Sequence, residues 1–262
     1  MDIAFLCSPS LGEFQRRVVA SFLAADSAHR IVGCVIDSQP RPSLMQRVRK
    51  NRSRGRGGYM LIMALRLLSR SRSSETDSGV LFKEMGVPII TTEDPYGEET
   101  CRRISALRPD VLLLLGGFGI LKGPLLTVAP QGVLSYHHGD MRKYRGQPAA
   151  FWELYEGEGS IGATVQRLSS GIDCGEPIVE RSFAIRETDT LGSLSHRIFE
   201  GSADMMFEAV QRLEDPSFRP EVIESFGRLY TLPNLRQWIV FQVRVGRRVL
   251  RARMSSVPVR CV

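Results

Sequence analysis

Short apolar runs alternate with amphipathic stretches over most of this chain. Short, almost wholly apolar runs are typical of strands that are buried on both faces of a sheet. Stretches whose apolar residues recur every three or four positions predict helices between those strands. We expect strands over residues 3–7, 31–36, 87–91, 110–115, 132–136, 163–168 and 176–181. We expect helices over residues 14–23, 96–107, 147–156 and 190–213, the last one capped by Asp189 and Thr190.

This alternation predicts an α/β fold with a Rossmann-like, open, mostly parallel sheet and helices on both faces. Open sheets of this kind bind ligands at the carboxyl ends of their strands. The apolar run 110–115 ends at Gly116-Gly117, and the next run, 132–136, leads into a polar segment. We therefore look for functional residues after these two strands.

The last part of the chain, residues 214–262, has a different pattern. A helix is expected from Pro233, because proline suits the first helical turn. At 100° per residue its arginines fall within an arc of about 120°, and large apolar residues lie opposite. The arginines are Arg236, Arg244, Arg247, Arg248 and Arg251, and the apolar residues are Leu235, Trp238, Ile239, Phe241, Val245 and Val249. We expect a main domain over 1–213 and a small basic C-terminal extension with this amphipathic helix over 214–262.

The positive charge is concentrated in two segments. The chain has a net charge of +7, and ten of its 35 Lys and Arg residues lie between Arg41 and Arg72, where there is no Asp or Glu. We treat residues 41–78 as a basic insertion in the main domain; the second basic segment follows Glu224. Three interpretations stay open, namely solvated surfaces, an anionic membrane surface bound through residues 59–72 and 233–253, and nucleic acid. Nucleic acid is the least favoured of the three because no known nucleic-acid-binding motif is recognisable.

Cysteine usage and the apolar runs bear on the compartment. The five cysteines are scattered and show no spacing typical of a metal site, so we expect no metal and a reducing environment. The N-terminal residues do not have the pattern of a signal peptide, and no apolar run is long enough to span a membrane. These observations predict a soluble cytoplasmic protein that is a candidate for peripheral binding at the inner membrane face.

Two motifs carry the candidate chemistry. They are GVLSYHHGDMRKYRG at residues 132–146 and GATVQRLSSGIDCGEPI at residues 162–178. Together they resemble the 10-formyltetrahydrofolate-dependent formyltransferases, which include glycinamide ribonucleotide, methionyl-tRNA and sugar-nucleotide N-formyltransferases. That family has Asn-x-His at a strand end, then Tyr/Trp-Arg-Gly, and later Asp-x-Gly. The matching positions here are His137, residues 143–146 and residues 173–175, and the resemblance covers roughly residues 1–213.

The resemblance implies transfer of a formyl group from 10-formyltetrahydrofolate to an amine. His137 would move a proton between the attacking and leaving nitrogens, because histidine titrates near neutrality, and Asp173 would orient it. Ser135 stands where the family has the asparagine that stabilises the oxyanion, and His138 is a candidate auxiliary group. The serine leaves three alternatives open, namely a working transferase, a related acyl or carbamoyl transferase or formyl hydrolase, and a catalytically inactive homologue that binds a membrane or a partner.

The resemblance also nominates binding residues. The folate site would consist of Gly116, Gly117, Phe118, Gly119, Ile120, Leu121, Ser170, Gly171, Ile172 and Asp173. The acceptor site would include Ser10, Tyr144, Arg145 and Gly146. The alternative is that Tyr144 and Arg145 only lock a loop by packing and that Ser10 lies in an ordinary turn.

The acceptor that we favour is an amino sugar linked to a nucleotide or a lipid. A methionyl-tRNA enzyme of the family would have a larger C-terminal domain than the residues after position 213 provide. A purine-pathway enzyme would be shorter and would have no need of two arginine-rich segments. The sequence leaves the oligomeric state undetermined.

Overall fold

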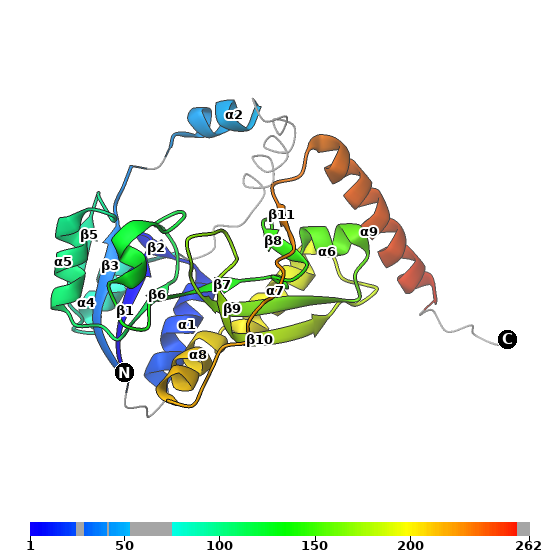
Figure 1. Cartoon of the computed structure of the whole chain (residues 1–262). Helices are drawn as coiled ribbons and strands as arrows, with labels where there is room; N and C mark the ends of the chain where they lie inside the picture. The colour runs from blue at the N-terminus through cyan, green and yellow to red at the C-terminus, as the bar shows by residue number, and fades with distance from the viewer. Residues whose placement is uncertain (25–28, 41, 53–74, 256–262) are drawn as a thin grey trace.

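The computed structural model describes residues 1–24, 29–40, 42–52 and 75–255. Its centre is a seven-stranded sheet in the order β10-β9-β7-β6-β1-β3-β5 (Figure 1). Neighbouring strands from β5 to β7 run parallel, whereas β9 runs antiparallel to both β7 and β10. The strands are β1 (Asp2–Cys7), β3 (Arg30–Asp37), β5 (Ile89–Thr92), β6 (Val111–Leu114), β7 (Val133–His137), β9 (Ser160–Arg167) and β10 (Glu176–Ala184). The open, mostly parallel, Rossmann-like sheet is confirmed.

Helices cover both faces of this sheet. Phe5 and Leu6 are adjacent on β1 and fully buried, yet they belong to different core clusters. The cluster around Phe5 includes side chains of α1 (Glu13–Ala24), α4 (Ser78–Glu84), α6 (Phe151–Glu156), α7 (Leu191–Ser202) and α8 (Met205–Glu214). The cluster around Leu6 includes side chains of α5 (Glu98–Ala106) and of the 3-10 helix η1 (Gly123–Thr127). Because β1 is enclosed on both sides, its run of apolar residues is nearly continuous.

The single helix expected over 190–213 is wrong, because the structure has two helices there. The capping by Thr190 is confirmed, since its side chain accepts a hydrogen bond from the backbone N–H of Ser193. However, α7 ends at Ser202 and α8 begins at Met205. The Tyr136 hydroxyl from β7 donates to the Ser202 carbonyl at 2.9 Å and accepts from the Met206 N–H at 3.0 Å. A continuous helix would pair that carbonyl with that N–H, so the tyrosine takes the place of one helical hydrogen bond.

Residues 214–255 pack on the rest of the protein through one strand and one helix. Strand β11 (Arg228–Tyr230) pairs in parallel with β8 (Tyr144–Gly146). Helix α9 (Leu235–Ser255) lies beside α6, where Phe241 stacks on Phe151 with ring centroids 4.4 Å apart (Figure 1). The expected helix is confirmed, but it begins at Leu235, after Pro233, and the Asn234 side chain caps it by accepting from the Gln237 N–H at 2.8 Å.

The basic insertion is described only in part. It contributes α2 (Leu44–Arg52) and the short strand β4 (Thr76–Asp77), which pairs with β2 (Ser10–Leu11). The segment 59–72, which we considered as a membrane contact, lies outside the described residues. No helix in the described part of the chain is both long enough and apolar enough to cross a membrane.

Candidate active site

A cavity of about 170 Å³ lies at the carboxyl ends of β6 and β7. Three segments form it, namely the loop after β6, Ser135 on β7, and residues 168–175 between β9 and β10, which we call the Asp173 loop. Its lining is Leu114, Gly119, Ile120, Leu121, Ser135, Leu168, Ser169, Gly171, Ile172 and Asp173. The cavity is therefore largely apolar and carries one carboxylate and two hydroxyl groups.

Seven residues that the sequence nominated meet in this cavity. They are Gly119, Ile120, Leu121, Ser135, Gly171, Ile172 and Asp173. The other nominated folate residues do not line it. Phe118 is 3% exposed, and its backbone N–H donates to Asp37 at 2.8 Å. Gly116 and Gly117 lie against Ser8, and Ser170 lines a separate surface hollow beside η1.

The loop after β6 is held by Tyr96, a residue that the sequence did not single out. Its hydroxyl donates to the backbone carbonyls of Phe118 and Ile120. Gly119 lies between these two residues. It has a φ of +60°, and a Cβ atom at this position would have nothing within 4 Å. The tyrosine thus holds this wall of the cavity on both sides of Gly119.

The Asp173 carboxylate is held by three groups from three segments. Its Oδ2 accepts a hydrogen bond from the Gly146 N–H at 2.8 Å and lies 3.4 Å from His137 Nδ1. Its Oδ1 accepts from Gln166 Nε2 at 3.2 Å. The backbone of Asp173 has a φ of +46°, which a side-chain-bearing residue seldom adopts. Strained backbone of this kind is found preferentially at functional sites.

His137 lies behind Asp173 relative to the cavity. Its side chain is 6% exposed, and Nε2 is 2.8 Å from the Tyr144 carbonyl oxygen. A carbonyl can only accept, so Nε2 carries the proton and Nδ1 faces the carboxylate. The structure thus brings the nominated pair together, with Asp173 lining the cavity and His137 contacting it from the protein interior.

Gln166 is a site residue that the sequence did not single out. It is fully buried on β9, where Nε2 donates to Asp173 and Oε1 accepts from the Gly175 N–H at 3.0 Å. It therefore holds the Asp173 loop at two points. No local signal distinguishes it, because the predicted strand 163–168 also contains the polar residues Thr164 and Arg167.

The motif at residues 144–146 shapes the site through backbone and loop contacts. Gly146 supplies the N–H that binds Asp173. Arg145 donates through Nε to the Gly227 carbonyl at 2.8 Å and through Nη1 to the Ile172 carbonyl at 3.3 Å. Tyr144 donates to Glu158 at 3.0 Å. These contacts favour the alternative in which Tyr144 and Arg145 lock the loop.

His138 and Ser10 lie apart from Asp173. The His138 ring stacks on Tyr136, packs edge-on against Phe199, and contacts the Ser202 hydroxyl through Nε2 at 3.2 Å. Burial, with a smaller effect of neighbouring His137, lowers the pKa of His138 to about 3, so this ring is neutral at pH 7. Ser10 donates to Glu75 at 2.7 Å beside the β2–β4 pair. Neither residue lines the cavity that contains Asp173.

Glu153 on α6 is a buried acid. It lies near His137, since both residues line a small void of about 10 Å³. Burial raises the pKa of Glu153 to about 7, and Glu158 and Asp140 act in the same direction. Because the folded state holds this proton more tightly than the unfolded chain, ionisation of Glu153 lowers the stability as the pH rises from about 4.5 to 7. We expect Glu153→Gln to raise the free energy of unfolding at pH 8 by about 2–3 kcal/mol and to have little effect at pH 4.5.

Urea unfolding at the two pH values measures this difference. Glu156→Gln is the matched control, because Glu156 is on the same helix and exposed. Its stability should follow that of the wild type at both pH values. An equal stability of Glu153→Gln and wild type at pH 8 would show that the Glu153 carboxyl is not destabilising.

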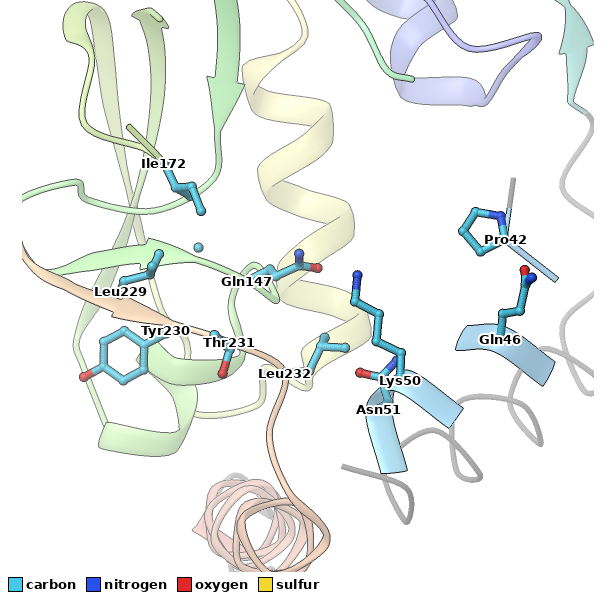
Figure 2. A pocket seen from close by; sticks show the side chains of 11 residues that line it. Pro42, Gln46, Lys50, Asn51, Gln147, Ile172, Leu229, Tyr230, Thr231 and Leu232 are labelled. Carbon is cyan, nitrogen blue, oxygen red and sulfur yellow. The ribbon is translucent and has the colours of Figure 1, made fainter. Parts of the chain in front are cut away.

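A larger cleft of about 690 Å³ adjoins the Asp173 loop (Figure 2). One wall is the region of α2, with Pro42, Gln46, Lys50 and Asn51. The other wall is formed by Gly146, Gln147, Ile172, Leu229, Tyr230, Thr231 and Leu232. Ile172 lines both hollows, and Gly146 both lines the cleft and binds Asp173. The cleft and the smaller cavity therefore meet at the Asp173 loop.

Comparison with known proteins agrees with this arrangement. The formyl transferase family model matches residues 64–210, which is more than half of the chain. Methionyl-tRNA formyltransferase from Anaeromyxobacter sp. (strain K) is 28% identical over 220 residues, which cover 84% of this chain and 61% of that protein. A second relative of the same name, from Geobacter metallireducens, is 28% identical over 52% of this chain and 43% of its own length. The chain thus spans about three fifths or less of the length of these relatives.

Solved structures share the fold. Glycinamide ribonucleotide transformylase 1 from Symbiobacterium toebii aligns with a TM-score of 0.59 and 18% identity over 87% of this chain and 92% of that one. The sugar 3N-formyl transferase WlaRD aligns with a TM-score of 0.59 and 13% identity over 94% and 78% of the two chains. The family model matches more than half of the chain, and the Asp173 loop meets β7 at a cavity, as the resemblance implied. The chain therefore belongs to the formyl transferase family.

Proposed function

We propose that this protein transfers a formyl group from 10-formyltetrahydrofolate to the amino group of an amino sugar that is linked to a nucleotide or a lipid. The observation that carries this proposal is the cavity at the ends of β6 and β7, where Ser135 and Asp173 meet apolar walls. A formyl donor needs a slot for its flat pterin ring next to a proton-accepting group. The lining residues offer both.

The cavity has the chemistry that a pterin would require. Leu114, Leu121, Leu168 and Ile172 provide apolar contacts. The Gly119 N–H donates to the Gly117 carbonyl at 2.6 Å, so the Gly119 carbonyl oxygen would be the group that accepts hydrogen bonds from polar ring edges. We propose these residues as the donor site, and we assign Gly116, Gly117 and Phe118 to the support of its wall.

Asp173 would receive the proton that the attacking amine loses when its nitrogen bonds to the formyl carbon. His137 would share this proton through Nδ1, since Nε2 is already donating to the Tyr144 carbonyl. The same proton would then pass to the leaving nitrogen as its bond to the formyl carbon breaks. This scheme reverses the roles that the resemblance implied, because Asp173 lines the cavity and His137 does not. Asp173 would contact the reacting atoms, and His137 would act through Asp173.

Ser135 would donate its hydroxyl to the oxyanion that forms on the formyl oxygen. It lines the same cavity as Asp173, and its hydroxyl makes a long contact of 3.5 Å to the Tyr136 carbonyl. We expect Ser135→Ala to lower kcat by about 10²-fold, because the loss of one oxyanion donor typically has an effect of that order. Affinity for folinic acid, a stable formyl-folate, should change by less than about threefold, since Ser135 would act only on the transition state.

Steady-state rates and calorimetric titration with folinic acid measure these two effects. Ser169→Ala is the control, because Ser169 lines the same cavity but its hydroxyl donates to the Cys174 carbonyl. Ser135→Asn should also be slower than wild type, because the larger amide would crowd a cavity that is built around serine. Full activity of Ser135→Ala would rule out the oxyanion role.

The larger cleft is our candidate for the acceptor site, because it adjoins the Asp173 loop. Lys50 provides a positive charge for a phosphate, as in a nucleotide-linked or phosphate-linked sugar, and Gln46 and Asn51 provide amides. We propose that residues 1–213 form the catalytic domain with its basic insertion, 41–78. Residues 214–262 would then be an extension that completes the cleft through Tyr230 and Leu232.

A direct assay of the proposed reaction supplies 10-formyltetrahydrofolate and a panel of 3-amino and 4-amino sugar nucleotides. We expect release of tetrahydrofolate that depends on one amino sugar, and a mass gain of one formyl group on that sugar. Methionyl-tRNA is a separate arm, because the sequence relatives have that name. Release of formate without an acceptor would indicate a hydrolase, and failure to bind any formyl-folate would overturn the proposal.

We propose a reducing compartment such as the cytoplasm for this activity. Cys7 and Cys34 are buried on the adjacent strands β1 and β3, and both are free thiols. A hydrogen bond that the Cys7 thiol donates to Cys34, together with burial, raises the pKa of the Cys7 thiol, which keeps it in the protonated form. Paired thiols that stay unlinked are typical of proteins in reducing compartments.

A further inference from the structure

Helix α9 has two apolar faces, and only one of them packs on the protein. Trp238, Phe241 and Val245 are buried against the body of the molecule. Five other large apolar side chains of α9 are between 44% and 69% exposed: Leu235, Ile239, Val243, Leu250 and Met254. At 100° per residue these five fall within an arc of about 100°, which is centred nearly opposite Phe241. We call them the outer stripe.

The outer stripe differs from the apolar face that the sequence pattern predicted. That face included Trp238 and Phe241, which the structure places in the core. Only Leu235 and Ile239 of the expected set belong to the outer stripe. Val243, Leu250 and Met254 complete it in the sector between that predicted apolar face and the predicted arginine arc.

The charges on α9 are all of one sign. The helix has six arginines and no acidic residue. Two of them face the protein: Arg244 donates to the Tyr155 carbonyl at 2.7 Å, and Arg248 donates to the Glu187 carbonyl at 3.2 Å. The other four, Arg236, Arg247, Arg251 and Arg253, are exposed and border the outer stripe on its two sides. The outer face of α9 is thus an apolar stripe between cationic margins.

The position of α9 leaves this face accessible in the described part of the chain. The helix runs along one edge of the molecule, beside α6 and away from β5 at the opposite end of the sheet (Figure 1). Its 21 residues give it a length of about 30 Å. A helix of this length with one apolar side packed on the protein could lie flat along a planar surface through its outer stripe.

We propose that α9 docks the protein on an anionic membrane, with the outer stripe inserted at the boundary between headgroups and acyl chains. An apolar stripe bordered by arginines matches that boundary, because the stripe enters the apolar layer while the guanidinium groups contact lipid phosphates. A second copy of the chain is a poorer match, since two such faces would bring arginines together with no acid on either helix. Nucleic acid would leave the five apolar side chains without a contact.

Co-sedimentation of the full chain with vesicles tests this proposal. We expect binding to phosphatidylcholine vesicles that contain about one third phosphatidylserine, and much weaker binding to pure phosphatidylcholine. Ile239→Ser with Leu250→Ser should reduce the bound fraction at least tenfold, because two inserted side chains lose their apolar contact. Arg247→Gln with Arg251→Gln should also weaken binding and should reduce its dependence on salt.

The controls separate docking from folding and from catalysis. Val222→Ser changes an exposed valine outside α9 and should leave vesicle binding unchanged. The α9 variants should keep the wild-type Tm and the wild-type rate with a soluble acceptor, because neither pair of residues lines the cavity or the cleft. Equal pelleting of wild type and Ile239→Ser/Leu250→Ser would overturn the proposal. It would also be overturned if sedimentation velocity showed a dimer that this variant disrupts, without binding to vesicles.

Discussion

Asp173→Asn is expected to reduce the rate of formyl transfer by about 10³-fold. The amide has nearly the shape of the carboxylate, but it cannot accept a proton from the attacking amine. Its NH2 group would also face one of the three groups that now surround the carboxylate, namely Gly146, Gln166 and His137. One lost hydrogen bond should lower the free energy of unfolding by about 1 kcal/mol, so the variant should fold.

Initial rates with the best acceptor, together with the Kd for folinic acid, measure this effect. The Kd should change by less than about threefold, because the apolar walls of the cavity remain. Asp215→Asn is the control, since Asp215 is an acid in an exposed turn whose partner is Ser217. His137→Ala should lose less activity than Asp173→Asn, because His137 acts through Asp173. Wild-type turnover in Asp173→Asn would rule out Asp173 as the proton acceptor.

Gly146→Ala is expected to lower both stability and activity strongly. Gly146 has a φ of +88°, and a Cβ atom at this position would lie 2.1 Å from the Tyr230 carbonyl oxygen. This collision would separate β8 from β11 and draw the Gly146 N–H away from Asp173. We expect a loss of roughly 3 kcal/mol or more in the free energy of unfolding. Formyl transfer should fall more than about tenfold, because Asp173 would lose its shortest hydrogen bond.

Gly157→Ala is the matched control for that variant. Gly157 has a φ of +82°, but a Cβ atom there would have nothing within 4 Å. It should therefore lose only about 1–2 kcal/mol through backbone strain, with unchanged kcat. Denaturant unfolding of both variants gives the difference that is due to the collision with β11. Equal losses of stability in the two variants would show that the β8–β11 contact does not constrain the site.

Much of the fold could be predicted because its signals are local. Each central strand is a short apolar run, and Thr190 marks a helix start through its own side chain. The break between α7 and α8 could not be predicted, because it depends on the hydroxyl of Tyr136, which is some 66 positions earlier in the chain. The same holds for β11, whose three residues form a strand only by pairing with β8.

The two principal residues of the site could be predicted from the sequence, whereas the residues that hold them in place could not. His137 and Asp173 lie in motifs that can be recognised in the sequence, and the structure places His137 Nδ1 3.4 Å from Asp173 Oδ2. Gln166 was missed because its importance comes from two contacts across a loop. The apolar pattern of α9 was visible as well, but which of its faces packs on the protein depends on where Phe151 lies.

A crystal structure of the protein with folinic acid tests most directly whether the cavity beside Asp173 is the formyl-donor site. We expect the pterin between residues 119–121 and 168–172, with the formyl group directed toward Asp173 and Ser135. Folinic acid bound at another place, with this cavity empty, would contradict the account.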